Sequence, residues 1–127
     1  MKSLIALISL VGIGTVSAQN CSGRPDGSFE PNSKRCDYYY SCTGGLAIPL
    51  TCPSGYHYNP VRKQCDYPSK AGCIKCPSTG FRNLAVDGSC NKFIQCYHGT
   101  ATDRECPNGL NFDIALGQCN LEDSVKC

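Results

Sequence analysis

Hydrophobic and polar positions alternate over short stretches of this chain and rarely recur at the 3.6-residue spacing of a helix face. From position 20 onward, glycine, proline, asparagine and aspartate interrupt the apolar positions every few residues. Short alternating stretches bounded by such residues are typical of β-strands joined by turns. The pattern therefore predicts an almost entirely β protein, with almost no helix after Ala18.

The predicted strands form hairpins, and the same arrangement occurs twice. Each half of the chain has a hairpin with a glycine-containing turn, followed by a second hairpin that ends the unit. The first-half ranges are 37–42, 46–52 and 52–65, and the second-half ranges are 91–96, 100–106 and 106–119. Thr43-Gly44-Gly45 and His98-Gly99 are the expected turns of the first hairpins, because glycine readily adopts positive φ.

The segment from Met1 to Ala18 has the features of a secretory signal peptide. Lys2 supplies a positive charge, residues 4–13 are almost all apolar, and Val16-Ser17-Ala18 places small residues before a cleavage point. The apolar stretch is shorter than the roughly 20 residues that span a bilayer. We therefore expect cleavage after Ala18 and a soluble, secreted mature chain. Asn20-Cys21-Ser22 matches a glycosylation sequon, although the Asn adjoins the new N-terminus.

The twelve cysteines form two sets of six with a nearly constant offset. The sets are Cys21, Cys36, Cys42, Cys52, Cys65 and Cys73, then Cys76, Cys90, Cys96, Cys106, Cys119 and Cys127. The offset is identical for every pair except the first, Cys21 and Cys76, where it is longer by a single position. This repeat predicts two tandem modules, at residues 19–74 and 75–127. Only Ile74 and Lys75 separate the two sets, so the modules are expected to sit side by side in a restricted orientation.

An even number of cysteines behind a secretory signal indicates disulfides, since the extracellular space is oxidising. Each module has about 53 residues, and a core of that size supplies little net stability without covalent links. Spacing alone leaves 15 possible pairings within each module. Cys73-x-x-Cys76 is not interpreted as a zinc or redox motif, because each cysteine completes the set of six of its own module. His57 and His98 have no cluster of other metal-ligating residues nearby in the sequence. No metal or cofactor is expected.

Charge gives little indication of an ionic partner. The chain has 12 Lys and Arg against 10 Asp and Glu, and Lys2 belongs to the signal. We therefore expect no nucleic acid or membrane as partner, and a monomeric chain. Glycoside hydrolysis needs two carboxylates about 5 to 9 Å apart in a cleft. Glu122-Asp123 and Asp103-x-Glu105 are interpreted as solvated charges, so no enzyme activity is expected.

The cysteine spacing is C-x14-C-x5-C-x9-C-x12-C-x7-C, with x13 first in the second module. Residues 52–60 read Cys-Pro-Ser-Gly-Tyr-His-Tyr-Asn-Pro, and residues 65–68 read Cys-Asp-Tyr-Pro. With the tyrosines before Cys42, this pattern resembles the peritrophin-A, or type 2, chitin-binding domain, over essentially the whole mature chain. Residues 52–73 also resemble tachycitin, an antimicrobial chitin-binding peptide.

The resemblance implies a small disulfide-rich β fold, with two small antiparallel sheets per module. It also implies pairing of the first cysteine with the third, the second with the sixth and the fourth with the fifth. The implied disulfides are Cys21–Cys42, Cys36–Cys73, Cys52–Cys65, Cys76–Cys96, Cys90–Cys127 and Cys106–Cys119. The implied ligand is chitin or an oligomer of N-acetylglucosamine.

Tyrosine suits such a ligand, because its ring covers the C–H face of a sugar while the hydroxyl stays hydrated. Module one has six of the seven tyrosines, too many for so small a domain to bury. The candidate binding residues are Tyr67, Tyr58, Asn59, Tyr38 and Tyr40 in module one, with Phe112 and Asp113 as counterparts in module two. Tyr39 is expected in the core, and Tyr58 and Asn59 each have a structural alternative.

Module two is expected to have the poorer sugar surface, since Leu121 and Glu122 replace the Tyr67-Pro68 pair. The leading hypothesis is a secreted, non-catalytic protein that binds or cross-links chitin in an extracellular matrix such as peritrophic membrane or cuticle. One alternative is an antimicrobial chitin-binding defence peptide, although the mature charge of +1 is low for attacking membranes. Another is a disulfide-rich ligand or inhibitor without sugar affinity.

Overall fold

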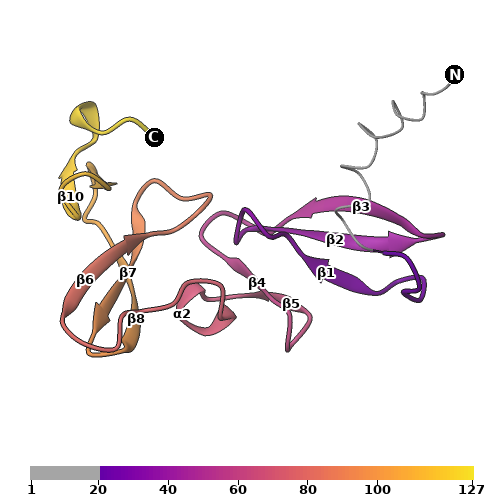
Figure 1. Ribbon diagram of the computed structural model, residues 1–127. Coiled ribbons are helices and arrows are strands. Elements are labelled where there is room, and N and C mark those ends of the chain that lie inside the picture. The colour runs from indigo at the N-terminus through magenta and orange to yellow at the C-terminus, as the bar shows by residue number, and fades with distance from the viewer. Residues whose placement is uncertain (1–20) are drawn as a thin grey trace, which may run out of the picture.

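The computed structural model describes residues 21–127, and Figure 1 shows their arrangement. The predicted signal peptide and the Asn20 sequon lie outside the described residues. The elements of module one are β1 (Phe29–Pro31), β2 (Tyr38–Thr43), β3 (Leu46–Thr51), β4 (His57–Asn59), β5 (Gln64–Asp66) and α2 (Pro68–Ala71). The elements of module two are β6 (Phe81–Ala85), β7 (Lys92–Tyr97), β8 (Thr100–Glu105), β9 (Leu110–Asp113), β10 (Gln118–Leu121) and the 3₁₀ turn η2 (Glu122–Ser124).

Each module has one three-stranded and one two-stranded antiparallel sheet. The larger sheets have the orders β1-β2-β3 and β6-β7-β8, and the smaller ones are the hairpins β4-β5 and β9-β10. The two small sheets per module and the near absence of helix were both predicted, and the fold class is confirmed. The third strand of each larger sheet, β1 and β6, was not predicted. Neither short strand has the β-branched, alternating composition that reveals a strand in sequence.

All twelve cysteines are bonded, in the six pairs that the family resemblance implies. The Cys52–Cys65 bond crosses the second hairpin of module one, with Cys65 opposite Tyr58 in register. The Cys36–Cys73 bond joins the segment before β2 to the end of the module, over a separation of 37 residues. The covalent links therefore tie both sheets of a module together.

One ring stack joins the two sheets within each module. In module one, Tyr39 of β2 stacks on Tyr58 of β4, with ring centroids 4.6 Å apart and planes 6° from parallel. In module two, Phe93 of β7 stacks on Phe112 of β9 at 4.9 Å and 14°. Tyr58 and Phe112 are both buried. These rings supply much of the core in domains that have few other buried apolar side chains.

The two modules pack directly against each other. Backbone and side-chain groups of module one bond to module two at three places: Cys36 N to Asp87 Oδ2 at 2.9 Å, Ser54 Oγ to Gly88 O at 2.9 Å, and Ser69 N to Asp103 Oδ1 at 3.0 Å. Figure 1 shows β4, β5 and α2 lying between the two larger sheets. The contacts hold the modules in a defined relative orientation.

Gly88 shows how closely the modules approach. Its φ is +80°, and a Cβ built on it would lie 2.5 Å from Asp37 Oδ2 of module one. Both the positive φ and the lack of space therefore require glycine at this position.

Candidate functional site

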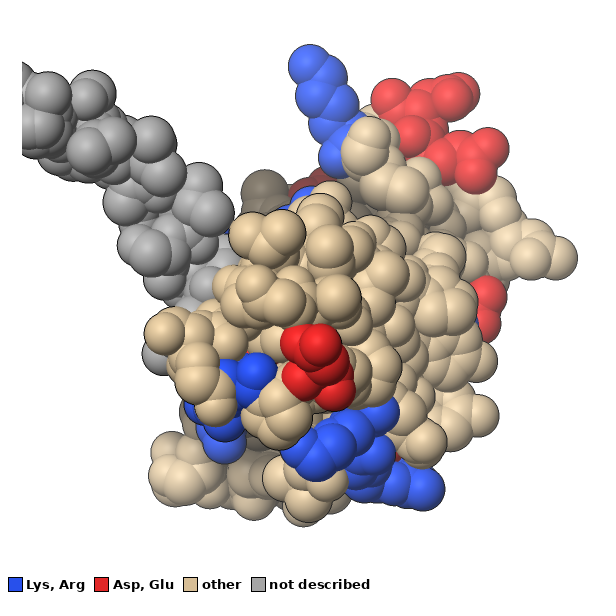
Figure 2. All heavy atoms as spheres, turned by 90° about the vertical axis from the view of Figure 1, so that its right-hand side faces the viewer, with Lys and Arg blue, Asp and Glu red and all other residues tan. Residues whose placement is uncertain are grey.

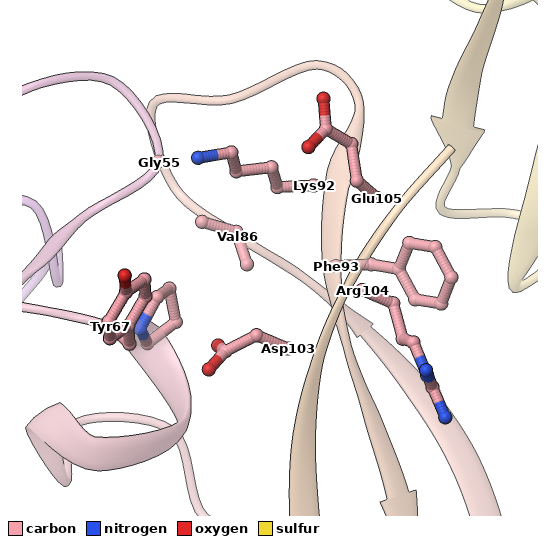
Figure 3. Close-up of a pocket in the computed structure, with 9 residues that line it drawn as sticks. Gly55, Tyr67, Val86, Lys92, Phe93, Asp103, Arg104 and Glu105 are labelled. Atoms are coloured by element: carbon pink, nitrogen blue, oxygen red, sulfur yellow. The ribbon is translucent and has the colours of Figure 1, made fainter. Parts of the chain in front are cut away.

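A cleft of about 180 Å³ lies at the junction of the two modules. Module one contributes Tyr67 and Pro68, and module two contributes side chains from the loop before β7 and from β7 and β8. Figure 3 shows Val86, Lys92 and Asp103 pointing toward module one, while Phe93 and Arg104 point to the opposite face of the sheet. The cleft thus combines an aromatic ring from one module with polar and apolar side chains from the other.

Tyr67 is held in place by its backbone and presents half of its side chain to solvent. Its amide N donates to Asp66 Oδ1 at 2.8 Å, and it lies at the N-cap of α2, just before Pro68. The Tyr67 side chain is 50% exposed, and its ring centroid lies 5.7 Å from that of Tyr56. Such a ring loses little conformational entropy when it stacks on a ligand.

The charged groups in the cleft are engaged with the protein. Lys92 Nζ lies 5.1 Å from the centroid of the Tyr56 ring, within cation–π range. Asp103 accepts hydrogen bonds from both the backbone N and the Oγ of Ser69. These side chains therefore fix the walls of the cleft and the start of α2. Lys92 and Asp103 were not predicted as site residues, because their position depends on how the modules dock.

Tyr38 and Tyr40 lie together on the other face of β2 from Tyr39. The guanidinium of Arg35 lies 4.4 Å from the Tyr38 ring centroid and covers one face of that ring. Asn32 Nδ2 donates to the Tyr40 hydroxyl at 2.7 Å. Neither tyrosine lines the junction cleft, so the structure does not bring them together with Tyr67.

Arg35 is itself fixed by Asp37, with Nε and Nη2 donating to the two carboxylate oxygens at 2.9 and 2.8 Å. These hydrogen bonds from Arg35 lower the pKa of Asp37, against the opposing effect of burial. The pair is therefore ionised near neutral pH and holds Arg35 over Tyr38.

Tyr58 and Asn59 are buried and serve the fold, which corrects their assignment as sugar-binding candidates. Tyr58 is 3% exposed, and burial raises the pKa of its hydroxyl. Asn59 Oδ1 accepts hydrogen bonds from Val61 N at 3.0 Å and Arg62 N at 3.1 Å, closing the β4–β5 turn. We leave both residues out of the proposed binding surface, because a buried side chain presents no face to a polymer.

Phe112 is corrected on the same ground, whereas Asp113 is only partly buried and its role in sugar binding stays a prediction. Phe112 is buried in its stack with Phe93, and Asp113 Oδ1 accepts from Leu116 N at 3.2 Å in the matching turn. Asn120 Nδ2 donates to Asp113 Oδ2 at 3.2 Å.

In each module, an amide and a carboxylate side chain link the two strands of the second hairpin, and the two residue types change places between the modules. In module one an amide, Asn59, donates from β4 to a carboxylate, Asp66, on β5 at 3.1 Å. In module two the carboxylate, Asp113, is on the first strand and the amide, Asn120, is on the second. The carboxamide–carboxylate bond is therefore preserved, which explains why Asp113 replaces Asn59 without loss of the turn.

His57 is completely buried beside the junction, and neither ring nitrogen has a hydrogen-bond partner among the described residues. Burial lowers its pKa, while the charges of Asp87, Asp37 and Asp103 oppose that shift. His57 is therefore neutral near pH 7 and is not accessible to a ligand.

Charge is dispersed over the face of the molecule that Figure 2 shows. Figure 2, an end-on view of the molecule, shows a largely uncharged face with small separate groups of basic and acidic side chains. No helix within residues 21–127 is long and apolar enough to cross a membrane. The visible surface favours an uncharged ligand over a strongly charged one.

Comparison with known proteins identifies the modules. The family described as "Chitin binding Peritrophin-A domain" matches residues 21–73 and again residues 76–127. These matches cover most of the chain, and they contain both sets of six cysteines. The predicted boundaries at residues 19–74 and 75–127 remain a prediction.

Three relatives illustrate the range of proteins that contain similar sequences. The chain is 31% identical to "Probable endochitinase" of Caenorhabditis elegans, covering 84% of this chain but 22% of that protein. It is 24% identical to "Peritrophin-1" of Anopheles gambiae, covering 100% of this chain and 99% of that protein. It is 26% identical to "Protein obstructor-E" of Drosophila melanogaster, covering 98% of this chain and 55% of that protein.

Proposed function

The chain belongs to the chitin-binding peritrophin-A family, and from that premise we propose that it is a secreted, non-catalytic protein that binds chitin in an extracellular matrix. The ligand is chitin itself or an oligomer of N-acetylglucosamine. The observation that carries this proposal is the half-exposed Tyr67 ring at the junction cleft, held at its backbone by Asp66 and Pro68.

The chemistry of the cleft suits a neutral sugar. The exposed Tyr67 ring offers a flat apolar surface for the C–H face of a pyranose, and its hydroxyl stays at the edge. Lys92 and Asp103 from module two supply polar atoms on the opposite wall. A site that combines an aromatic ring with convergent polar groups can both stack on a sugar and fix its orientation.

The acidic side chains near the cleft support a binding role without catalysis. Glycoside hydrolysis uses one carboxylic acid and one carboxylate that act directly on the substrate. Asp103 accepts hydrogen bonds from Ser69 through both oxygens, and Glu105 Oε2 accepts from Asn91 Nδ2 at 3.1 Å. Both carboxylates are thus engaged in holding the fold. The match to the endochitinase relative covers 22% of that protein, consistent with an accessory module.

A matrix role is supported by the relatives and by the module arrangement. Peritrophin-1 matches this chain over nearly its whole length. Two modules in a fixed orientation can bind one chitin fibre with raised avidity, or cross-link neighbouring chains. Because a single chain supplies both modules, cross-linking needs no second copy.

Replacing Tyr67 by alanine is expected to weaken binding to chitin about fivefold or more, because one lost aromatic stack is worth about 1 kcal/mol. Tyr67→Phe retains the ring and is expected to bind nearly as well as the natural chain. The measurement is a depletion isotherm on colloidal chitin.

Leu121→Ala is the matched control, since Leu121 occupies the equivalent position of module two and is also exposed. It is expected to leave affinity unchanged. If Tyr67→Ala and the natural chain bind chitin with equal affinity and have the same melting temperature, Tyr67 is not part of the binding site.

A further inference from the structure

Module two has an exposed pair of aromatic rings that is not among the candidate binding residues named from the sequence. Phe81 of β6 and Tyr97 of β7 are each 60% exposed. They are directly opposed in the β6–β7 register, so both side chains project from the same face of the sheet. Module one has Thr43 where module two has Tyr97, and the aromatic pair therefore belongs to module two alone.

This face is directed away from module one. Along β7, Ile94 and Cys96 project to the side that forms the core with Val86, whereas Tyr97, Gln95 and Phe93 project to the other side. Figure 3 shows Phe93 pointing away from the junction. The Phe93–Phe112 stack lets the β9–β10 hairpin cover one end of the face, and the Phe81–Tyr97 end stays exposed.

The rings lie on a well-defined support. The His98 ring packs edge-on against Tyr97, with centroids 4.4 Å apart and planes at 76°. His98 N donates to Gly80 O at 2.9 Å, and Gly80 N donates to His98 Nδ1 at 3.3 Å. These reciprocal bonds tie the β7–β8 turn to the residue just before Phe81. The two aromatic positions are thereby fixed relative to each other before any ligand binds.

The side chains that follow the rings along this face are polar. Gln95 and Thr102 are opposed in register and lie next to the aromatic pair. Gln95 Oε1 accepts from Arg104 Nε at 3.2 Å, which orients the amide. Amide and hydroxyl groups beside exposed rings match the N-acetyl and hydroxyl groups of an aminosugar polymer.

A groove of about 380 Å³ runs beside the aromatic pair, between β6 and the β9–β10 turn. Phe81 lines it from one side, and Ile114 and Leu116 line it from the other. Both of these turn residues are highly exposed. The groove extends the apolar surface beyond the two rings, as binding of more than one sugar unit requires.

We propose that Phe81 and Tyr97 form a second chitin-binding surface, specific to module two. The proposal rests on the function proposed above and makes it more specific: the chain has one aromatic site at the module junction and another on the outer face of module two. Because Phe93 and Lys92, neighbours on β7, point to opposite sides, the two sites belong to opposite faces of the β6-β7-β8 sheet. Two sites so placed can engage two different chitin strands.

The test uses the full chain carrying Phe81→Ala and Tyr97→Ala together, compared with Tyr67→Ala and with Phe81→Tyr/Tyr97→Phe. The double alanine variant is expected to bind colloidal chitin about five- to tenfold more weakly and to lose the ability to aggregate chitin nanofibres. The Tyr/Phe exchange retains two rings and is expected to keep both properties. In the natural chain, chitotriose is expected to shift the backbone amide NMR signals of residues 81 and 97.

The outcomes separate the two proposals. Failure of the natural chain to bind chitin would overturn both. If the natural chain binds chitin, Tyr67→Ala weakens that binding and the double alanine variant binds as well as the natural chain, only the second surface is overturned. A natural dimer that the double alanine variant converts to a monomer, without change in chitin affinity, would show instead that the rings contact a second copy of the chain.

Discussion

Replacing Tyr58 by alanine is expected to lower the free energy of unfolding of module one by about 3–5 kcal/mol, the usual cost of deleting a large buried aromatic side chain. Tyr58 is 3% exposed and stacks on Tyr39, so its ring joins the β4–β5 hairpin to the larger sheet. Removal leaves a cavity between the sheets. Urea unfolding of the oxidised protein, followed by near-UV circular dichroism, measures the change.

Tyr58→Phe is the matched control. The Tyr58 hydroxyl is buried without a hydrogen-bond partner among the described residues, so its deletion is expected to leave stability unchanged or to raise it. Module two already has Phe112 in this position. A loss of chitin affinity in a fully stable Tyr58→Phe variant would contradict the structural role, because it would make the hydroxyl part of the sugar site.

Replacing Cys36 and Cys73 together by serine is expected to destabilise module one by about 4 kcal/mol, from the loop-closure entropy of a 37-residue separation. The same replacement of Cys52 and Cys65, 13 residues apart, is expected to cost about 3 kcal/mol. The Cys36–Cys73 bond has the larger effect because it restricts a longer loop in the unfolded chain. Denaturant unfolding of each variant gives the two values.

The control for this comparison is the equivalent pair in module two. Cys90–Cys127 also has a separation of 37 residues, so its removal is expected to weaken module two by a similar amount. A smaller loss from Cys36–Cys73 than from Cys52–Cys65 would show that the unfolded-state account is incorrect for this fold.

The sequence was sufficient to predict most of the architecture, because the cysteine repeat and the turn residues act locally. The hairpin joined at Gly44-Gly45 and its partner at His98-Gly99 could be located from composition alone. The strands β1 and β6 could not, since they become strands only by pairing with β2 and β7. Tertiary pairing, rather than intrinsic preference, determines such short edge strands.

The candidate site was harder to predict for two physical reasons. A motif shows that an aromatic or an amide is required, but not whether it faces solvent, and so Tyr58 and Asn59 were assigned to the sugar although they are buried. Module two shows an exchange of residue types, with Asp113 and Asn120 where module one has Asn59 and Asp66. Its meaning is clear once the hydrogen bonds are known.

Other residues become part of a site only through the tertiary structure, that is, through module docking or strand register. Lys92 and Asp103 reach the cleft only because module two docks on α2 and on the loop before β4. Phe81 and Tyr97 become neighbours only through the register of β6 on β7. Module two ranked as the poorer sugar surface because Leu121 and Glu122 replace the Tyr67-Pro68 pair, and the exposed Tyr97 has no tyrosine counterpart in module one to draw attention to it.

The central claim, that the chain binds chitin through ring stacking and hydrogen bonds, is tested most directly by retention of the natural oxidised chain on insoluble chitin during a wash in strong salt. Salt screens ionic contacts but leaves ring stacking and hydrogen bonds nearly unaffected. We expect the protein to remain bound at high salt and to be released by soluble N-acetylglucosamine oligomers. Complete elution by moderate salt, with no competition by the oligomers, would contradict the account and indicate ion exchange.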